Sequence, residues 1–280
     1  MAFPECNEWD DDEPSPMRRL QTAVLFYCGK SQPPKALSSF TFNNLWPYPL
    51  SQTVKNGGLR RFLSTICSFT LVVSKQDLEA AYCTAAFMDF FGGEFNVLLD
   101  CLPKKLATLS IETPFLQDST VIGLERPRFP SLTSLRLENI LFFVPYSLTG
   151  EIVLPADFGT FEGFILRHHS LEHLALVDCS MDIPESGFDT NRTWASFINT
   201  GLKEHLPNLK ELRIINSGLA LGIDAQVVRR SGYARLNLGY GWIDAAHSRE
   251  LREQEQHVLR PLDIAAHEEI QSILSHRRTL

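Results

Sequence analysis

Residues 206–219 read LPNLKELRIINSGL, and the spacing of their apolar residues fits neither a helix nor a strand alone. Leu206, Leu209 and Leu212 are three apart, and Ile214 follows after two residues. A helix repeats every 3.6 residues and a strand every two, so we interpret the stretch as a turn that leads into a short strand. One such unit cannot bury its own apolar face, so copies of it must stack against each other.

The template L-x-x-L-x-L-x-x-(N/C/S)-x-L occurs repeatedly along the chain. Clear copies begin at Leu106, Leu132, Leu171 and Leu209, and looser copies begin at Leu37, Ile66 and Tyr233. The Leu171 copy fits at every position, with Cys179 in the polar place. In the two copies before it, Pro114 takes the polar place and Asn139 comes one residue early. We expect the polar residue to hydrogen-bond the backbone of the following turn.

This unit predicts how the copies pack together. In the x-L-x-L-x strand the apolar residues point to one side of the sheet and the x residues to the other. The starts at 37, 66, 106, 132, 171 and 209 are separated by 29, 40, 26, 39 and 38 residues, mostly longer than the 20–29 of regular leucine-rich repeats. We therefore predict an α/β fold: an irregular leucine-rich-repeat solenoid with a curved parallel sheet on the concave side, helices on the convex side and a C-terminal capping helix. The alternative is an ordinary α/β domain with leucine-rich strands.

Helix-compatible segments fill the gaps between the copies. Residues 194–206 place on one helical stripe the apolar residues Trp194, Phe197, Ile198, Leu202 and Leu206. Residues 161–169 precede the next strand in the same way, and residues 17–28 and 76–91 are further helix candidates, the latter ended by Gly92-Gly93.

The chain divides into three regions. Residues 1–16 are predicted to be an acidic disordered tail, residues 17–245 the solenoid, and residues 246–280 a polar linker followed by the capping helix. Asp263 is the predicted N-cap of that last helix. The aromatic segment 46–50 (WPYPL) is interpreted as hydrophobic cover over the first turns, with a partner-contacting edge as the alternative.

Composition excludes several classes of function. The 280 residues carry a net charge of -7, which argues against broad binding to nucleic acid or to an anionic membrane. The chain has neither the apolar run of a signal peptide at its N-terminus nor a stretch long enough to span a bilayer. The six cysteines are not closely paired, so we expect reduced, mostly buried thiols and a cytoplasmic or nuclear location.

No catalytic, cofactor-binding or metal-binding motif is present, and none is predicted. His168, His169 and His173 cluster near a helix-to-strand turn, where we interpret them as exposed turn residues, with His173 on the open face of the sheet. His267 begins a zincin-like pattern, but Gln271 stands where a second histidine ligand would be needed.

The outward strand positions form the candidate protein-binding surface. These are Thr108, Ser110, Glu112, Ser134, Arg136, Glu138, His173, Ala175, Val177, Glu211, Arg213 and Ile215. Their mixture of charge, hydroxyl and apolar groups suits a protein surface better than a phosphate backbone.

The segments FPSLTSLRLENI, LEHLALVDC and LPNLKELRI, with aromatic helices between them, resemble the leucine-rich-repeat region of fungal F-box proteins. The resemblance covers about residues 35–240. In that family an F-box docks on the Skp adaptor of a cullin–RING ubiquitin ligase, and the repeats present the substrate. The resemblance therefore implies a substrate-like protein partner on the concave sheet.

Residues 1–35 do not match an F-box, which opens with Leu-Pro-x-Glu. We therefore expect the recognition part alone, as a fragment, a truncated gene product or a family member that lost its adaptor-binding module. Skp and cullin are expected partners only if an F-box lies outside this chain or is hidden within it. The alternatives are a stand-alone repeat scaffold or inhibitor without a ubiquitin connection, and a hydrolase without a recognisable motif.

Overall fold

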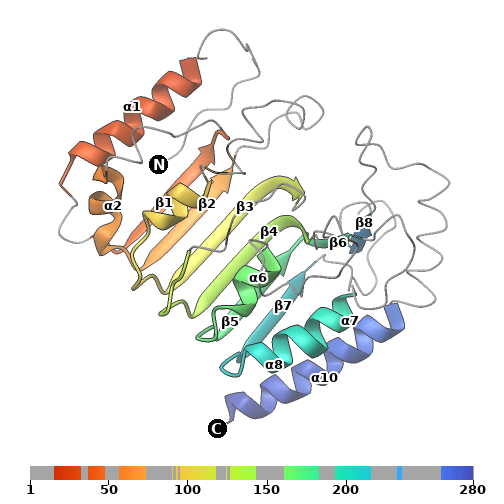
Figure 1. Ribbon diagram of the computed structural model, residues 1–280. Coiled ribbons are helices and arrows are strands. Elements are labelled where there is room, and N and C mark those ends of the chain that lie inside the picture. The colour runs from red at the N-terminus through yellow and green to blue at the C-terminus, as the bar shows by residue number, and fades with distance from the viewer. Residues whose placement is uncertain are drawn as a thin grey trace, which may run out of the picture.

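A computed structural model describes residues 16–32, 37–47, 57–73, 90, 93, 95–117, 124, 127–142, 161–182, 193–215, 232–234 and 260–279. A parallel sheet runs through them in the order β1-β2-β3-β4-β5-β7 (Figure 1). The strands are β1 (Ser39–Leu45), β2 (Ser68–Val73), β3 (Thr108–Gln117), β4 (Ser134–Phe142), β5 (His173–Val177) and β7 (Glu211–Ile215). Each strand belongs to one of the first six template copies, so the predicted α/β fold and parallel sheet are confirmed.

Two short strands pair outside this series. β6 (Ser180–Asp182) pairs with the end of β4, and β8 (Gly232–Ala234) pairs with β6. β8 includes only the first two residues of the looser copy at Tyr233 and pairs with β6, while the strand predicted from Arg235 onward lies outside the described residues. Positive φ angles at Asn139 and Asp178, immediately before this second set of pairings, are tolerated because Asn and Asp readily adopt left-handed backbone conformations.

All five junctions between consecutive strands of the series use the same backbone hydrogen bonds. One carbonyl oxygen at the entry of a strand accepts two successive N–H groups from the entry of the next strand. For example, the carbonyl of Ala107 accepts from Thr133 and Ser134 at 2.9 and 3.0 Å. The other accepting carbonyls belong to Ser38, Cys67, Thr133 and Glu172. We call this arrangement the shared-carbonyl entry. At two junctions a side chain donates to the same carbonyl: Thr133 Oγ1 to Ala107 O and Cys67 Sγ to Ser38 O, both at 3.3 Å. The backbone bonds are common to all five junctions, so the arrangement recurs although the side chains differ.

A tight turn precedes each of the last five strands of the series. The N–H of the first template residue donates to the carbonyl three residues earlier, as in Leu132 to Phe129 at 2.9 Å. The same bond closes the turns that end at Ile66, Leu106, Leu171 and Leu209. The unusual spacing of the apolar residues follows from this geometry, since the first template residue sits in a turn and only the next two lie in a strand.

Helices lie in the connections that precede β2, β3, β5 and β7. They are α2 (Gly58–Phe62), α5 (Phe95–Asp100), α6 (Phe161–Leu166) and the continuous segment α7 (Trp194–Ser196), η4 (Phe197–Leu202) and α8 (Lys203–His205). The predicted stripe over 194–206 is confirmed, because all five of its residues are buried. The predicted helix at 76–91 lies outside the described residues except for Phe90. The 46–50 segment is described only at Trp46 and Pro47, which are buried.

The core lies between one face of the sheet and these helices. Parallel crossovers are almost always right-handed, so strands added in consecutive order place their connections on the same face. Burial agrees with this rule, because most template residues of the strands in the series are buried, Phe40 and Ile214 being only partly buried. The opposite face carries the x residues of the template.

A helix lies at each end of the sheet (Figure 1). α1 (Pro16–Lys30) packs against α2, where a side chain on Gly58 would collide with the backbone of Gly29. Its Gln21 amide donates to the Trp46 carbonyl at 2.9 Å and accepts from the Trp46 N–H at 2.8 Å. The first strand therefore ends against α1.

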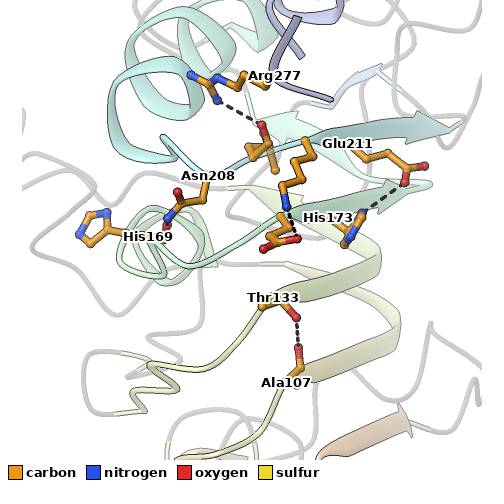
Figure 2. Close-up of polar contacts among 10 residues, drawn as sticks. Ala107, Thr133, His169, His173, Asn208, Glu211 and Arg277 are labelled. Carbon is orange, nitrogen blue, oxygen red and sulfur yellow. Dashed lines mark hydrogen bonds and ion pairs between the residues drawn. The ribbon is translucent and has the colours of Figure 1, made fainter. Parts of the chain in front are cut away.

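At the other end, α10 (Arg260–Arg278) covers β7. Glu211 N–H and Ile215 C=O both bond toward β5, so the intervening Leu212 carbonyl points to the outer edge, where Gln271 donates to it at 2.9 Å. Covering an edge in this way prevents another strand from pairing with it. Arg277 also donates to Leu206 O at 3.0 Å (Figure 2).

Asp263 does not have its predicted role. α10 begins three residues earlier, and the Asp263 carboxylate accepts from the N–H of Ala195 at 2.9 Å. It therefore caps α7 together with Thr193, whose hydroxyl accepts from Ser196 N–H at 3.0 Å. The N-cap preference predicted that Asp263 would bond to a helix N-terminus, but a tertiary contact decides which helix receives it.

Candidate protein-binding face

The strand register brings the outward residues into three parallel rows. Row 1 is Ser39, Ser68, Thr108, Ser134, His173 and Glu211. Row 2 is Thr41, Thr70, Ser110, Arg136, Ala175 and Arg213. Row 3 is Val72, Glu112, Glu138, Val177 and Ile215. We call these rows together the open face. All twelve residues predicted for the binding surface lie in them.

The predicted residues differ in how far they reach solvent. Arg136, His173 and Arg213 are exposed, and eight of the others are half-buried. Val177 is the exception, because only 7% of it is exposed although it lies in row 3. Its outward position was predicted correctly, but it offers little surface to a partner.

The open face has two chemically different halves. Across β1, β2 and β3, rows 1 and 2 consist only of serine and threonine. From β4 onward the rows carry arginine, glutamate and histidine. The prediction omitted the residues of β1 and β2, because phenylalanine replaces leucine in their templates. The available signal was the template spacing from Leu37 and Ile66, with phenylalanine at some of the leucine positions and with Ser39, Thr41, Ser68 and Thr70 at the x positions.

Ion pairs connect neighbouring residues in the charged half. Arg136 donates to Glu138 at 2.6 Å, and His173 Nδ1 lies 3.3 Å from Glu211 Oε2 (Figure 2). At the strand entries Lys210 donates to Glu172 at 2.9 Å, and this hydrogen bond holds the pKa of the Glu172 carboxyl below its usual value. Exposed pairs of this kind contribute little to stability. Their charges therefore remain able to rearrange around a partner.

His168 is buried, contrary to its predicted place in an exposed turn. Only 3% of it is exposed, and it stacks on Phe129 with the ring centroids 5.9 Å apart. Nε2 accepts from Phe129 N–H at 3.1 Å, so the proton of the neutral ring is on Nδ1, which lies 2.6 Å from the Phe164 carbonyl. Burial lowers the pKa of His168 to about 4, which makes this histidine a neutral connector between two turns.

The other two histidines of the cluster follow the prediction. His169 is exposed in the turn before β5, where its Nδ1 lies 2.7 Å from the His205 carbonyl. Asn208 donates to the His169 carbonyl at 3.0 Å, so these residues join the last two turns (Figure 2). His173 lies on the open face. No group of three or more His, Cys, Asp or Glu side chains in the described part of the chain could hold a metal ion.

The described cysteines are free thiols, and Cys28, Cys101 and Cys179 are buried. Burial raises the pKa of Cys101 to about 11 and that of Cys179 to about 12, so neither thiol ionises at neutral pH. Cys179 Sγ instead donates to the carbonyls of Val177 at 3.3 Å and of Leu137 in β4 at 3.6 Å, so it bonds to the backbone of the strands and not, as expected, to the following turn. In the Leu106 copy the donor is Thr113, one residue before Pro114, at 2.9 Å from Asn139 O.

His267 and Gln271 also form a structural contact. The Gln271 amide lies 3.1 Å from His267 Nε2 while it donates to the edge of β7. Burial lowers the pKa of His267, which favours the neutral ring in this contact. The zincin-like pattern therefore contributes to the cover of the sheet edge.

Comparison with protein-family models, curated proteins and solved structures finds no significant match to this chain. Within the described ranges, no helix is both long and apolar enough to cross a membrane.

Proposed function

We propose that this chain is a non-catalytic protein-interaction module that binds a protein partner on its open face. The observation that carries the proposal is the consecutive strand order, which leaves one polar face of a parallel sheet opposite the helices and the core. α10 covers the β7 edge of the sheet, and the chain leaving β1 is bound by α1, so we expect a partner to bind the open face rather than the β7 edge.

The repeated shared-carbonyl entry supports a solenoid. Each junction imposes the same relation between one strand and the next, and repetition of one relation produces a regular superhelical stack. A helix with its side chains is about 10 Å across, whereas neighbouring strands are about 4.8 Å apart, so we propose that the stack curves with the open face on its concave side, as in leucine-rich-repeat proteins. A concave face can contact a partner from several strands at once.

The resemblance to fungal F-box proteins extends the proposal to a biological role. In this role the open face holds a substrate-like protein, and the Skp adaptor and cullin bind through an F-box outside the repeats. This extension depends on the resemblance, and the binding role of the open face can be correct without it. Recovery of Skp and cullin with the tagged full chain tests it separately.

A blocking substitution tests the binding role. Ser110→Trp places a large side chain in the middle of row 2, and Glu204→Trp makes the matched change on the exposed surface of α8. Both variants and the parent chain are purified with a tag from eukaryotic cells, after circular dichroism has confirmed that they fold, and bound proteins are quantified by mass spectrometry. We expect Ser110→Trp to lose its specific partners more than tenfold and Glu204→Trp to keep them. Equal recovery by the two variants would contradict a role for the open face.

A further inference from the structure

In row 2 the small side chain of Ala175 lies between two long arginine side chains. Ala175 on β5 pairs in register with Arg136 on β4 and with Arg213 on β7. The side chains of Arg136 and Arg213 are 46% and 62% exposed, whereas Ala175 is a half-buried methyl group. We call Ala175 with these two flanking arginines the Ala175 gap.

The spacing of strands in a sheet allows both guanidinium groups to contact the same group of a ligand. Neighbouring strands are about 4.8 Å apart, so the two arginine backbones lie about 10 Å from each other with Ala175 between them. An extended arginine side chain spans more than half of that separation. A group placed above Ala175 can therefore accept hydrogen bonds from both sides.

The nearest charges to the gap are positive. Arg136 and Arg213 are the direct cross-strand neighbours of Ala175, whereas Glu138 and Glu211 are displaced by two residues along the flanking strands. Direct neighbours on one face are closer than diagonal ones, so the arginines are attached nearer to Ala175 than the two glutamates are. His173 precedes Ala175 by two residues on the same face and adds a donor when it is protonated.

The existing ion pairs leave donors for a ligand. Each guanidinium has five N–H groups. The Nη2 group of Arg136 binds Glu138 at 2.6 Å, and Arg213 Nε lies 3.9 Å from Glu211, beyond hydrogen-bonding distance. Paired arginines bind planar or tetrahedral anions in a defined geometry, which a single lysine does not.

We propose that the Ala175 gap receives one acidic side chain of the protein partner, either a carboxylate or a phosphorylated residue. The proposal rests on the proposed function, because it assigns the chemistry of a contact on the same face. It predicts that the partner presents a single negative group at the centre of the charged half, with uncharged polar groups over β1, β2 and β3.

The charge preference of the gap can be measured without a partner. Ala175→Glu places a carboxylate between the arginines, and Ala175→Lys places an ammonium group there. We expect the Glu variant to melt about 3 °C or more above the Lys variant. This difference should disappear when both arginines are changed to glutamine. Thr70→Glu and Thr70→Lys are the matched control, since Thr41 and Ser110 flank Thr70 in row 2 and carry no charge; these variants should melt together. Equal melting of the two Ala175 variants, or a higher value for Lys, would overturn the proposal.

Peptide binding then distinguishes this proposal from the proposed function. Four pools of random peptides of one length, with glutamate, phosphoserine, alanine or lysine fixed at the centre, are passed over the immobilised full chain. We expect the glutamate or the phosphoserine pool to be retained at least fivefold over the alanine pool, and the stronger of the two identifies the anion. Arg136→Gln with Arg213→Gln should abolish the preference, and Arg61→Gln on the exposed surface of α2 should not.

If the parent chain retains all four peptide pools equally and Ser110→Trp retains none of them, the proposed acidic contact is overturned, but the open face remains a binding surface. An acidic preference that survives the double arginine change would also overturn it, because the anion would then bind elsewhere. If Ser110→Trp and the arginine variants both keep the partners that the full chain binds, the proposed function itself is overturned.

Discussion

At each end of the sheet a glutamine side chain hydrogen-bonds backbone groups of the terminal strand segment, but the two glutamines differ in burial. At the N-terminal end Gln21 is 1% exposed and satisfies both backbone groups of Trp46, whereas at the C-terminal end Gln271 is partly buried and satisfies only the Leu212 carbonyl. α10 adds Arg277, which donates to two further carbonyls, and Asp263, which caps α7. One end therefore depends on a buried amide and the other on contacts distributed along a helix.

The outer surfaces of the two helices also differ. α1 exposes Leu20, Phe26 and Tyr27, whereas α10 exposes Leu262 as its large apolar residue among those described. Apart from Pro261 and Ala265, the other exposed residues of α10 are polar, as predicted for a helix that closes a stack. The comparison teaches that a helix can pack at the end of a sheet without presenting a polar outer surface.

Loss of the apolar anchors is expected to have the largest effect at both ends. Leu25 on α1 and Leu274 on α10 are almost fully buried, so each Leu→Ala change should lower the free energy of unfolding by about 3 kcal/mol. The matched controls are Leu20→Ala and Leu262→Ala on the exposed sides of the same helices, which should cost less than about 1 kcal/mol. Urea unfolding measures all four variants. A small cost for Leu274→Ala alone would mean that α10 is held mainly by its polar contacts.

Substitution of the two glutamines should change the free energy of unfolding by different amounts at the two ends. Gln21→Leu leaves the N–H and carbonyl of Trp46 without their side-chain partner in a buried site, and we expect a loss of about 2 to 3 kcal/mol. Gln271→Leu removes one bond at a partly exposed edge and should cost about 1 kcal/mol. Gln32→Leu, an exposed position after α1, serves as the control in the same unfolding experiment. Equal losses for Gln21 and Gln271 would contradict the difference in burial.

A histidine near the middle of the sheet, His168, should make the stability of the fold depend on pH. The pKa of His168 is about 4 in the fold and about 6.5 when the chain is unfolded, so the unfolded state binds more protons between these values. The stability from the neutral ring is present above pH 6.5 and is lost as the pH falls toward 4. Between pH 7 and pH 5 this loss should be about 2 kcal/mol.

The His168 contribution can be isolated by difference. Unfolding free energies of the parent chain and of His168→Gln are compared at pH 7 and pH 5, and the variant should show the smaller pH dependence. His169→Gln, which changes the exposed neighbour, should retain the dependence of the parent chain. A parent-like dependence in His168→Gln would assign the acid sensitivity to other groups.

The smallest expected effect distinguishes the two terminal helices in acid. Burial lowers the pKa of His267 on α10, and α1 contains no histidine. Protonation of His267 removes the lone pair that faces Gln271, so the stability from this contact is lost as the pH falls below about 6.5. We expect amide hydrogen exchange to accelerate more in α10 than in α1 between pH 7 and pH 5.5, after correction for the intrinsic rate. His267→Gln should remove the difference and His276→Gln should not; a difference that persists in His267→Gln would exclude this mechanism.

The strands could be predicted because their signal is local. The L-x-x-L-x-L spacing reflects a turn followed by a strand within six residues, and the same spacing with phenylalanine marked β1 and β2. Their outward residues were still left out of the candidate surface, since the looser copies were given less weight. The strand register places every predicted outward residue in its row. This follows because each strand begins at the same position of its template, so equivalent residues pair across the sheet.

The errors arose where distant segments meet. His168 is polar and lies in a turn, and only the approach of Phe129 from 39 residues away makes it a buried residue. Asp263 caps a helix 68 residues earlier in the chain, and the two glutamines reach backbone groups that no local pattern connects to them. The gap at Ala175 likewise depends on three strands, so it becomes visible only when their register is known.

The shared-carbonyl entry has a consequence for how such a chain can change over generations. Because five junctions are closed by backbone groups, adding or removing an internal unit would recreate the same junction whatever side chains the neighbouring units carry. The outward residues contribute only backbone groups to that closure, so their side chains can diversify while the architecture is inherited unchanged. The terminal helices, whose contacts depend on particular side chains, would have to be retained each time the number of units varied.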